Sequence, residues 1–110
     1  MANLRRWILE MADGEPVEGV VIGEMGWGDF GKENVPNYDA MPKGVVLSWE
    51  EAEKWLDYDF GGRYKVLGCN AVWAWTKSWV IATGLYDGVI WPYRIPRHPT
   101  DMMPTMEGGG

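Results

Sequence analysis

The chain has 110 residues, which is the size of one domain and excludes a multidomain enzyme or a full dinucleotide-binding fold. Hydrophobic residues make up 46% and charged residues 24%, and an aromatic share of 14% with eight tryptophans excludes global disorder. The net charge of −6 opposes contact with a phosphate backbone, so we expect no direct nucleic-acid binding.

The first segments predict a helix and then a strand. Asn3 suits an N-cap, and the apolar residues after it recur at helical spacing, which predicts a helix over about 4–12. A run of β-branched residues after Pro16 predicts a strand over about 17–25.

Glycines and prolines interrupt residues 26–46, which we predict to form a long irregular loop. Long loops in compact domains often carry function. Aromatic anchors with an acidic neighbour would suit a protein interface, so we predict a partner-binding site at Trp27, Asp29, Phe30 and Tyr38. The alternative is that this loop folds back as structural cover, and the sequence leaves both open.

A second helix is predicted over about 49–57. Ser48-Trp49-Glu50-Glu51 has the pattern of a capping box, in which the first and fourth residues satisfy each other's backbone amides. A β-meander is then predicted over about 68–95. Asp87-Gly88 favours a two-residue hairpin turn within it.

Pro92 cannot donate to a ladder, which indicates that the last strand lies at an edge of the sheet. Because an edge strand can pair with another chain, a homodimer is compatible with this pattern. Residues 97–110 are predicted to be an extended tail. We therefore expect a single α+β domain over 1–110, with two short helices on a small, mostly antiparallel sheet.

No motif predicts catalysis, a cofactor or a metal ion. Residues 26–31 have G-x-G-x-x-G spacing, but no helical pattern follows to meet a pyrophosphate. Cys69 lies in a predicted strand, where a buried structural thiol is typical, and it is the one cysteine, so no intramolecular disulfide can form. Asp57 and Asp59 lack the remaining ligands of a calcium loop. We expect a non-enzymatic protein.

The N-terminus shows no signal-peptide pattern, and no apolar run is long enough to span a membrane, so we expect a cytoplasmic protein with no membrane contact. Residues 10–59 hold 13 of the 16 acidic residues but only three lysines. Such a surface would attract a basic protein, for example one that binds nucleic acid. Plain solubility is the alternative.

Three basic residues cluster between prolines near the C-terminus: Arg94, Arg97 and His98. Guanidinium groups on a rigid segment could clamp a carboxylate or phosphate, so a small-ligand or anion site that uses these residues and the Trp-rich sheet is the alternative function. These arginines could instead pair with the acidic half of the chain and pin the tail.

Three short motifs resemble small uncharacterised proteins encoded in phages and other mobile elements. They are W-T-K-S-W-V-I at 75–81, Y-D-G at 86–88 and I-P-R-H-P at 95–99. The similarity covers roughly residues 48–99 and departs at His98, where asparagine is usual. The resemblance implies a mobile-element accessory protein and carries no known activity. We expect such a protein to act by protein–protein contact, and inhibition of a host defence component fits that setting.

Overall fold

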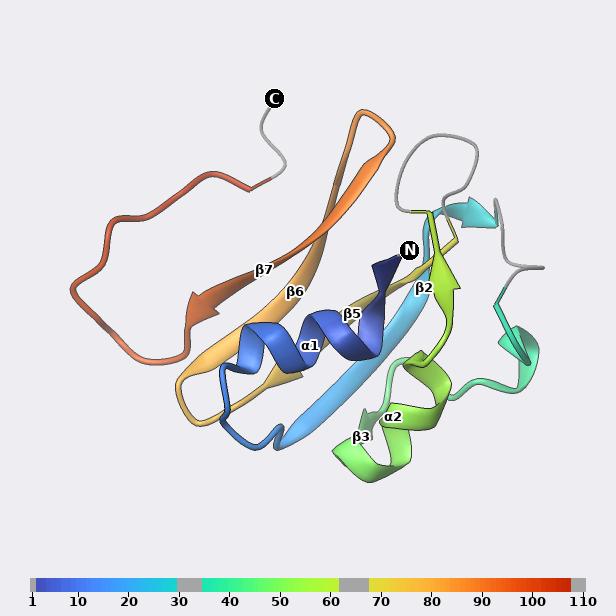
Figure 1. Cartoon of the computed structure of the whole chain (residues 1–110), viewed down its shortest axis with the longest axis horizontal. Coiled ribbons are helices and arrows are strands. Elements are labelled where there is room, and N and C mark those ends of the chain that lie inside the picture. Colours follow the sequence, from blue (N-terminus) through green and yellow to red (C-terminus); the bar gives the residue numbers. More distant parts are fainter. Residues whose placement is uncertain (1, 30–34, 62–67, 108–110) are drawn as a thin grey trace.

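The computed structural model describes residues 2–29, 35–61 and 68–107, with the backbone alone at 26–29. Two helices, α1 (Leu4–Ala12) and α2 (Trp49–Leu56), lie against the same side of a five-stranded antiparallel sheet (Figure 1). In spatial order its strands are β3 (Val46–Leu47), β2 (Gly19–Asp29), β5 (Asn70–Trp75), β6 (Trp79–Tyr86) and β7 (Val89–Pro96). The other described elements are a small sheet and a 3₁₀ helix: β1 (Ala2–Asn3), β4 (Asp59–Phe60) and η2 (Tyr38–Ala40).

This architecture confirms the predicted α+β class. The helix expected over about 4–12 is α1, and the one expected over about 49–57 is α2, which ends one residue earlier. The predicted meander corresponds to β5, β6 and β7, which pair in succession. β7 lies at an edge of the five-stranded sheet, as Pro92 indicated.

β2 is longer than the sequence predicts. It continues to Asp29, so its last residues lie inside the segment expected to be an irregular loop. A register shift between Ile22 and Met25 marks a β-bulge, after which Met25 pairs with Asn70. The bulge lets the strand continue past the glycines that break its alternating pattern, which is why the pattern alone places its end too early.

The N-terminal ends of both helices are capped by side chains. The Asn3 side chain accepts a hydrogen bond from the Arg6 amide at 3.0 Å, and its amide group donates to Asp57 and Asp59, which ties the start of α1 to β4. At α2 the Glu51 amide donates to Ser48 Oγ at 3.1 Å, while the Ser48 amide donates to Glu51 Oε1 at 2.9 Å. The predicted capping box is therefore present.

The hydrophobic core lies between the helices and one face of the sheet, and aliphatic side chains dominate it. Its most deeply buried members come from α1, α2 and the three central strands: Leu4, Ile8, Val20, Ile22, Ala52, Leu56, Val72, Ala74 and Ile81. No tryptophan whose side chain the structure describes is fully buried. Four of them pack at the margin of this core: Trp7, Trp49, Trp55 and Trp79. The others contribute to the opposite side of the sheet.

The hairpin between β6 and β7 has the geometry that Asp-Gly favours. Tyr86 pairs with Val89, and the two residues between them have positive φ, 50° at Asp87 and 73° at Gly88. Positive φ at both positions defines a type I′ turn, whose twist matches that of the flanking strands.

We predict that Gly88→Val lowers the free energy of unfolding by more than about 1 kcal/mol, because a β-branched residue is strained at positive φ. Chemical denaturation measures this change. Asp87→Asn is the matched control and should be nearly neutral, since asparagine also tolerates this conformation. Equal denaturation midpoints for wild type and Gly88→Val would contradict the turn type.

We predict that Ser48→Ala lowers the free energy of unfolding by about 1 kcal/mol without preventing folding, because it removes one hydrogen bond at the start of α2. The measurement is again the denaturation midpoint. A midpoint that does not move would mean that the capping box contributes nothing to stability.

Candidate interaction surface

The register of the sheet assigns every side chain to one of two faces. One continuous row crosses all five strands through Val46, Val21, Trp73, Ala82 and Tyr93. The next row along the strands is Leu47, Val20, Ala74, Ile81 and Arg94, and it lies beneath the helices. Because successive side chains in a strand point to opposite sides, the first row faces away from the helices. We call this side the outer face.

Apart from Glu24, which lies opposite Ala71 at the β2 bulge, the outer-face positions that the structure describes carry uncharged side chains. They are Val46, Gly19, Val21, Gly23, Ala71, Trp73, Trp75, Val80, Ala82, Gly84, Tyr86, Val89, Trp91, Tyr93 and Ile95. Antiparallel sheets with one face in water usually alternate apolar residues inside with polar residues outside. Here both faces are apolar, although about a quarter of the chain (24%) is charged.

Several outer-face side chains are well exposed. Val46 is 75% exposed, Trp73 60% and Ile95 53%. Trp73 belongs to β5, the middle strand, and lies in the middle of the row that crosses the sheet. A large exposed aromatic side chain at the centre of a mostly uncharged face is the arrangement typical of a binding surface.

Aromatic rings partly cover the small residues of β6. A Cβ atom on Gly84 would lie 2.8 Å from the Trp91 ring, so that ring lies directly over the glycine. The Trp91 Nε1 group also donates to Glu107 of the C-terminal tail at 3.1 Å. Ala82, which lies between Trp73 and Tyr93 in its row, is only 6% exposed. The β6–β7 half of the outer face is therefore preorganised by its own rings.

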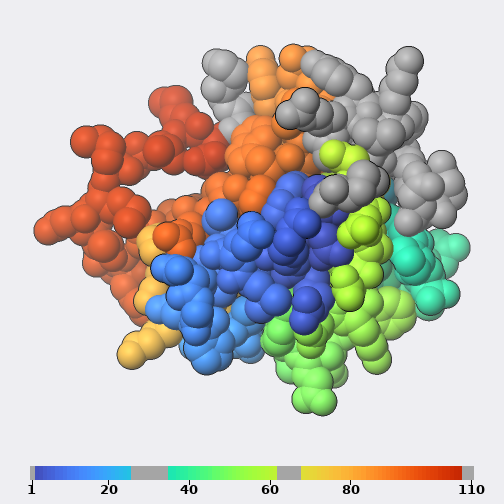
Figure 2. Space-filling view, viewed as in Figure 1, coloured from blue at the N-terminus to red at the C-terminus, as the bar shows by residue number. Residues whose placement is uncertain are grey.

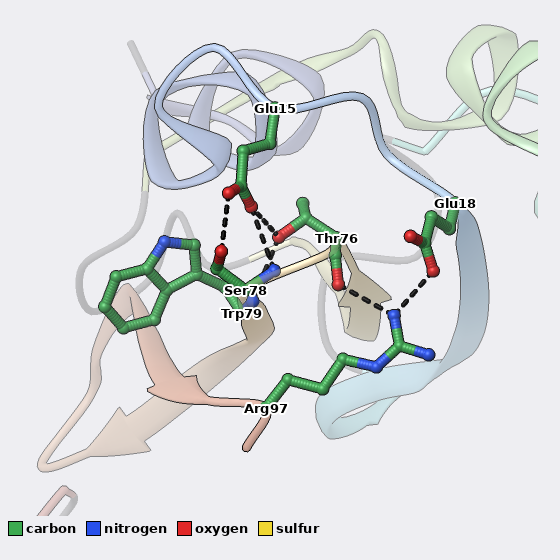
Figure 3. A network of polar contacts seen from close by, with 6 residues as sticks. All are labelled: Glu15, Glu18, Thr76, Ser78, Trp79 and Arg97. Carbon is green, nitrogen blue, oxygen red and sulfur yellow. Dashed lines mark hydrogen bonds and ion pairs between the residues drawn. The ribbon is translucent and has the colours of Figure 1, made fainter. Parts of the chain in front are cut away.

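A carboxylate holds the connection between α1 and β2 against the β5–β6 turn (Figure 3). Glu15 Oε1 accepts from Thr76 Oγ1 at 2.7 Å and from the Ser78 amide at 3.0 Å, and Oε2 accepts from Ser78 Oγ at 2.6 Å. Thr76 Oγ1 in turn accepts from the Trp79 amide at 3.0 Å. Hydrogen bonds from the Ser78 and Thr76 side chains hold the pKa of the Glu15 carboxyl below its ordinary value.

The two arginines proposed for anion binding both make contacts within the molecule. Arg97 Nη1 pairs with Glu18 at 2.5 Å and donates to the Thr76 carbonyl at 2.8 Å, which extends the Glu15 network (Figure 3). Arg94 donates to the Met11 carbonyl at 2.7 Å, and its guanidinium carbon lies 3.8 Å from the centre of the Trp79 ring. Their observed contacts are those expected if the arginines pin the tail.

A cleft of about 410 Å³ lies between β7 and the C-terminal tail, and the space-filling view shows the tail standing off the body there (Figure 2). Arg94, Arg97 and His98 all contribute to its lining, so the structure does bring the three predicted residues around one space. His98 is exposed, as are Met102 and Met103 across the cleft.

The predicted partner-binding site falls mostly outside the described residues. Trp27 and Asp29 belong to β2, but their side chains, like the whole of Phe30, lie outside the described part of the chain. Tyr38 is half-buried against the core, and its hydroxyl accepts from the Met25 amide at 3.2 Å. Lys43 Nζ lies 4.1 Å from the centre of the Tyr38 ring. In its described contacts Tyr38 acts as structural cover.

The residues weighed for catalysis or metal binding occupy separate places. Cys69 is 3% exposed, and burial raises the pKa of its thiol to about 12, so the thiol is neutral and unreactive at pH 7. Within residues 2–29, 35–61 and 68–107, no three His, Cys, Asp or Glu side chains are grouped closely enough to hold a metal ion. Over the same part of the chain, no helix is long and apolar enough to cross a membrane.

No family model, curated protein or solved structure matches this chain. The function of this surface is therefore inferred from its own side chains and geometry. The outer face was not identified from the sequence, although one signal was present. In Val72-Trp73-Ala74-Trp75 both alternating sets of residues are apolar, which is typical of a strand that is covered on both sides.

We predict that Glu15→Gln lowers the melting temperature at pH 7, because an uncharged amide accepts hydrogen bonds more weakly than a carboxylate. The folded-state pKa of Glu15 is lowered from 4.5, so its carboxylate contributes stability that is present above this pH and is lost as the pH falls through the lowered value. The gap between the two proteins should therefore narrow as the pH falls below 4.5.

Thermal melts across this pH range measure the gap. Glu50→Gln, on the exposed side of α2, is the control and should change the melting temperature little. A gap that stays constant as the pH falls well below 4.5 would contradict the assigned role of the Glu15 carboxylate.

Proposed function

We propose that this protein is a non-enzymatic interaction protein that binds another protein chain through the outer face of its sheet. The observation that carries the proposal is Trp73, 60% exposed at the centre of a face whose described positions are uncharged except for Glu24 at the β2 bulge. Leaving such a face in water is unfavourable, and covering it would release roughly 25 cal/mol for each Å² of apolar surface buried.

The size of the outer face suits a protein rather than a small molecule. Four strands spaced ~4.8 Å apart, each with about six residues that rise ~3.3 Å, give a footprint of roughly 400 Å², to which the two-residue β3 adds little. This matches the larger exposed apolar patches of monomeric proteins, which are often functional. A flat surface of this extent gives a small ligand little enclosure, whereas a second protein surface can cover it.

The motif resemblance gives this proposal a setting. A mobile-element accessory protein that acts by contact, for example as an inhibitor of a host defence component, would need a binding surface and no catalytic centre. Two of the resembling motifs, around Thr76–Ser78 and Arg97, build the network that fixes the turn beside this face. In this proposal those motifs preserve the scaffold, and the outer face contacts the partner.

A small-ligand or anion site in the cleft beside β7 is the second candidate. Its support is that Arg94, Arg97 and His98 line one space of about 410 Å³. Against it, an anion would have to compete with Glu18 for Arg97 and would find Arg94 held by a carbonyl oxygen and an aromatic ring. We therefore rank it below the interaction function.

We predict that Trp73→Ala weakens partner binding by about 2 kcal/mol or more, roughly 30-fold, while the melting temperature changes little, because an exposed aromatic contributes more to an interface than to the fold. Tagged wild type and variant are used to capture partners, with an untagged copy of this chain among the candidates, and the affinity for each captured protein is then measured.

Leu9→Ala is the matched control, because Leu9 is also exposed, at 40%, but lies on α1. It should leave binding unchanged. If Trp73→Ala and Leu9→Ala affect binding equally, the outer face is not the interface.

A further inference from the structure

The C-terminal tail is fastened to the sheet at two separate points. At its root, Arg97 bonds to two carbonyl groups of the β5–β6 turn and pairs with Glu18. Near its far end, Glu107 Oε2 accepts a hydrogen bond from Trp91 Nε1 at 3.1 Å. Residues 98–106 therefore run between two anchors, and the cleft beside β7 lies under them (Figure 2).

The tail itself orients the far anchor. Thr105 Oγ1 donates to Glu107 Oε1 at 2.7 Å, while Oε2 accepts from the Trp91 indole. These hydrogen bonds from Thr105 and Trp91 hold the pKa of the Glu107 carboxyl below its ordinary value, so the anchor is charged at pH 7. Because the Trp91 ring lies directly over Gly84, the tail is attached to an aromatic side chain of the outer face.

Apolar side chains of the tail line the cleft opposite the outer face. Met102 and Met103 belong to the tail and are 53% and 85% exposed. Tyr93 and Ile95, two outer-face residues of β7, contribute the facing part of the lining. Methionine is unbranched and flexible, so it adapts to irregular apolar surfaces. Closing the cleft would bring the two methionines against β7 and remove apolar surface from water on both sides.

The two anchors differ in strength. The root is held by an ion pair and by two carbonyl groups, whereas the far anchor is one exposed hydrogen bond between Glu107 and Trp91. Segments with few buried contacts open at low free-energy cost, so Glu107 detaches before Arg97 does. Pro99 and Pro104 restrict the conformations of the detached tail, which keeps its end close to the sheet and favours rebinding.

We infer that the C-terminal tail, residues 98–107, is a displaceable strap over the β7 side of the outer face, which a partner must lift to use the whole face. Glu107 holds the strap on Trp91, and its methionines close onto Tyr93 and Ile95. Trp73 on β5 stays open for the first contact. The strap lowers the apparent affinity of the face by the fraction of molecules in which it is closed. Its competition with a partner rests on the proposed function, whereas its closure does not.

Nuclear magnetic resonance of the full chain tests the far anchor. Each tryptophan indole N–H gives its own signal, and Trp91→Phe identifies the signal of Trp91. Glu107→Ala should shift this signal and speed its exchange with water about fivefold, because the indole loses its hydrogen-bond acceptor. A Trp91 signal that does not respond to Glu107→Ala would overturn the strap.

Asp101→Ala is the matched control for Glu107→Ala. Asp101 is an exposed carboxylate of the same tail, and its side chain makes no hydrogen bond or ion pair with the described residues. Its removal changes the charge equally and should leave the Trp91 signal as in wild type. If both variants shift the signal alike, the effect is one of charge and the assigned anchor is wrong.

Relaxation measurements on the tail backbone test the closure of the cleft. Met102→Gln and Met103→Gln together should make residues 98–106 more mobile, because the apolar contact with β7 is lost. Met106→Gln is the control, since Met106 is 92% exposed and does not line the cleft. Equal mobility of the tail in the double variant and in this control would mean that the methionines do not close the cleft.

Nile red, an uncharged dye that fluoresces on apolar surfaces, measures access to the outer face. Glu107→Ala should bind the dye about fivefold more tightly than wild type, because the strap no longer competes for the β7 side of the face. Asp101→Ala should bind it as wild type does. Equal dye affinities of wild type and Glu107→Ala would show that the tail does not cover the face.

The capture experiment separates this inference from the proposed function. A captured protein that depends on Trp73 should bind Glu107→Ala about fivefold more tightly than wild type. If its affinity is equal for the two, or lower for Glu107→Ala, the strap does not compete, and the proposed function stands. If no captured protein depends on Trp73, the proposed function fails, and the Trp91 signal and the dye still decide whether the tail covers the face.

Discussion

The Glu15 carboxylate joins the two layers of this molecule. It lies in the short connection between α1 and β2 and binds the turn between β5 and β6, more than sixty residues away in the sequence, through Thr76 and Ser78. Arg97 extends the joint by bonding to Glu18 and to the Thr76 carbonyl. The connection is thereby fixed at one end of the sheet, and α1 has to run back over β6 and β7. The helices consequently share one side.

That placement leaves the outer face without a helix among the described residues. The two helices lie on the other side of the sheet (Figure 1), and residues 97–107 approach the outer face only along β7, at Trp91, Tyr93 and Ile95. Its three methionines remain exposed, and its contact with the sheet at Trp91 is made by Glu107. An exposed apolar face favours contact with another molecule, and Trp73 lies at the centre of this face.

Local sequence signals predicted much of the fold. The capping box at Ser48, the Asp87-Gly88 pair and the edge position of Pro92 each depend on neighbouring residues or on a missing N–H group, so they can be recognised without knowing the tertiary structure. The C-terminal end of β2 was harder to predict from the sequence, because a β-bulge depends on the pairing with the neighbouring strand. The short pairing of β1 with β4 joins residues near 2 and 60 and leaves no local pattern.

The interaction surface was harder still to predict from the sequence, for a physical reason. A sheet that is covered on one side by its own helices and on the other by a second molecule has the same sequence pattern as a strand buried on both sides within one chain. Trp73 and Ala74 are both apolar, yet one is 60% exposed and the other fully buried. Hydropathy cannot separate them, and the sequence predicts the partner-binding site in the segment at 26–46 instead.

The prolines lie at the open edge of the sheet, whereas apolar side chains dominate its outer face. Prolines remove backbone donors at Pro92 and Pro96, where an open strand would otherwise recruit other chains without limit. The adjacent outer face keeps its apolar side chains, and Glu24 at the β2 bulge is the charged residue among its described positions. Because the missing donors disfavour the pairing of a further strand with β7, the proposed contact with a partner uses the outer face rather than this edge.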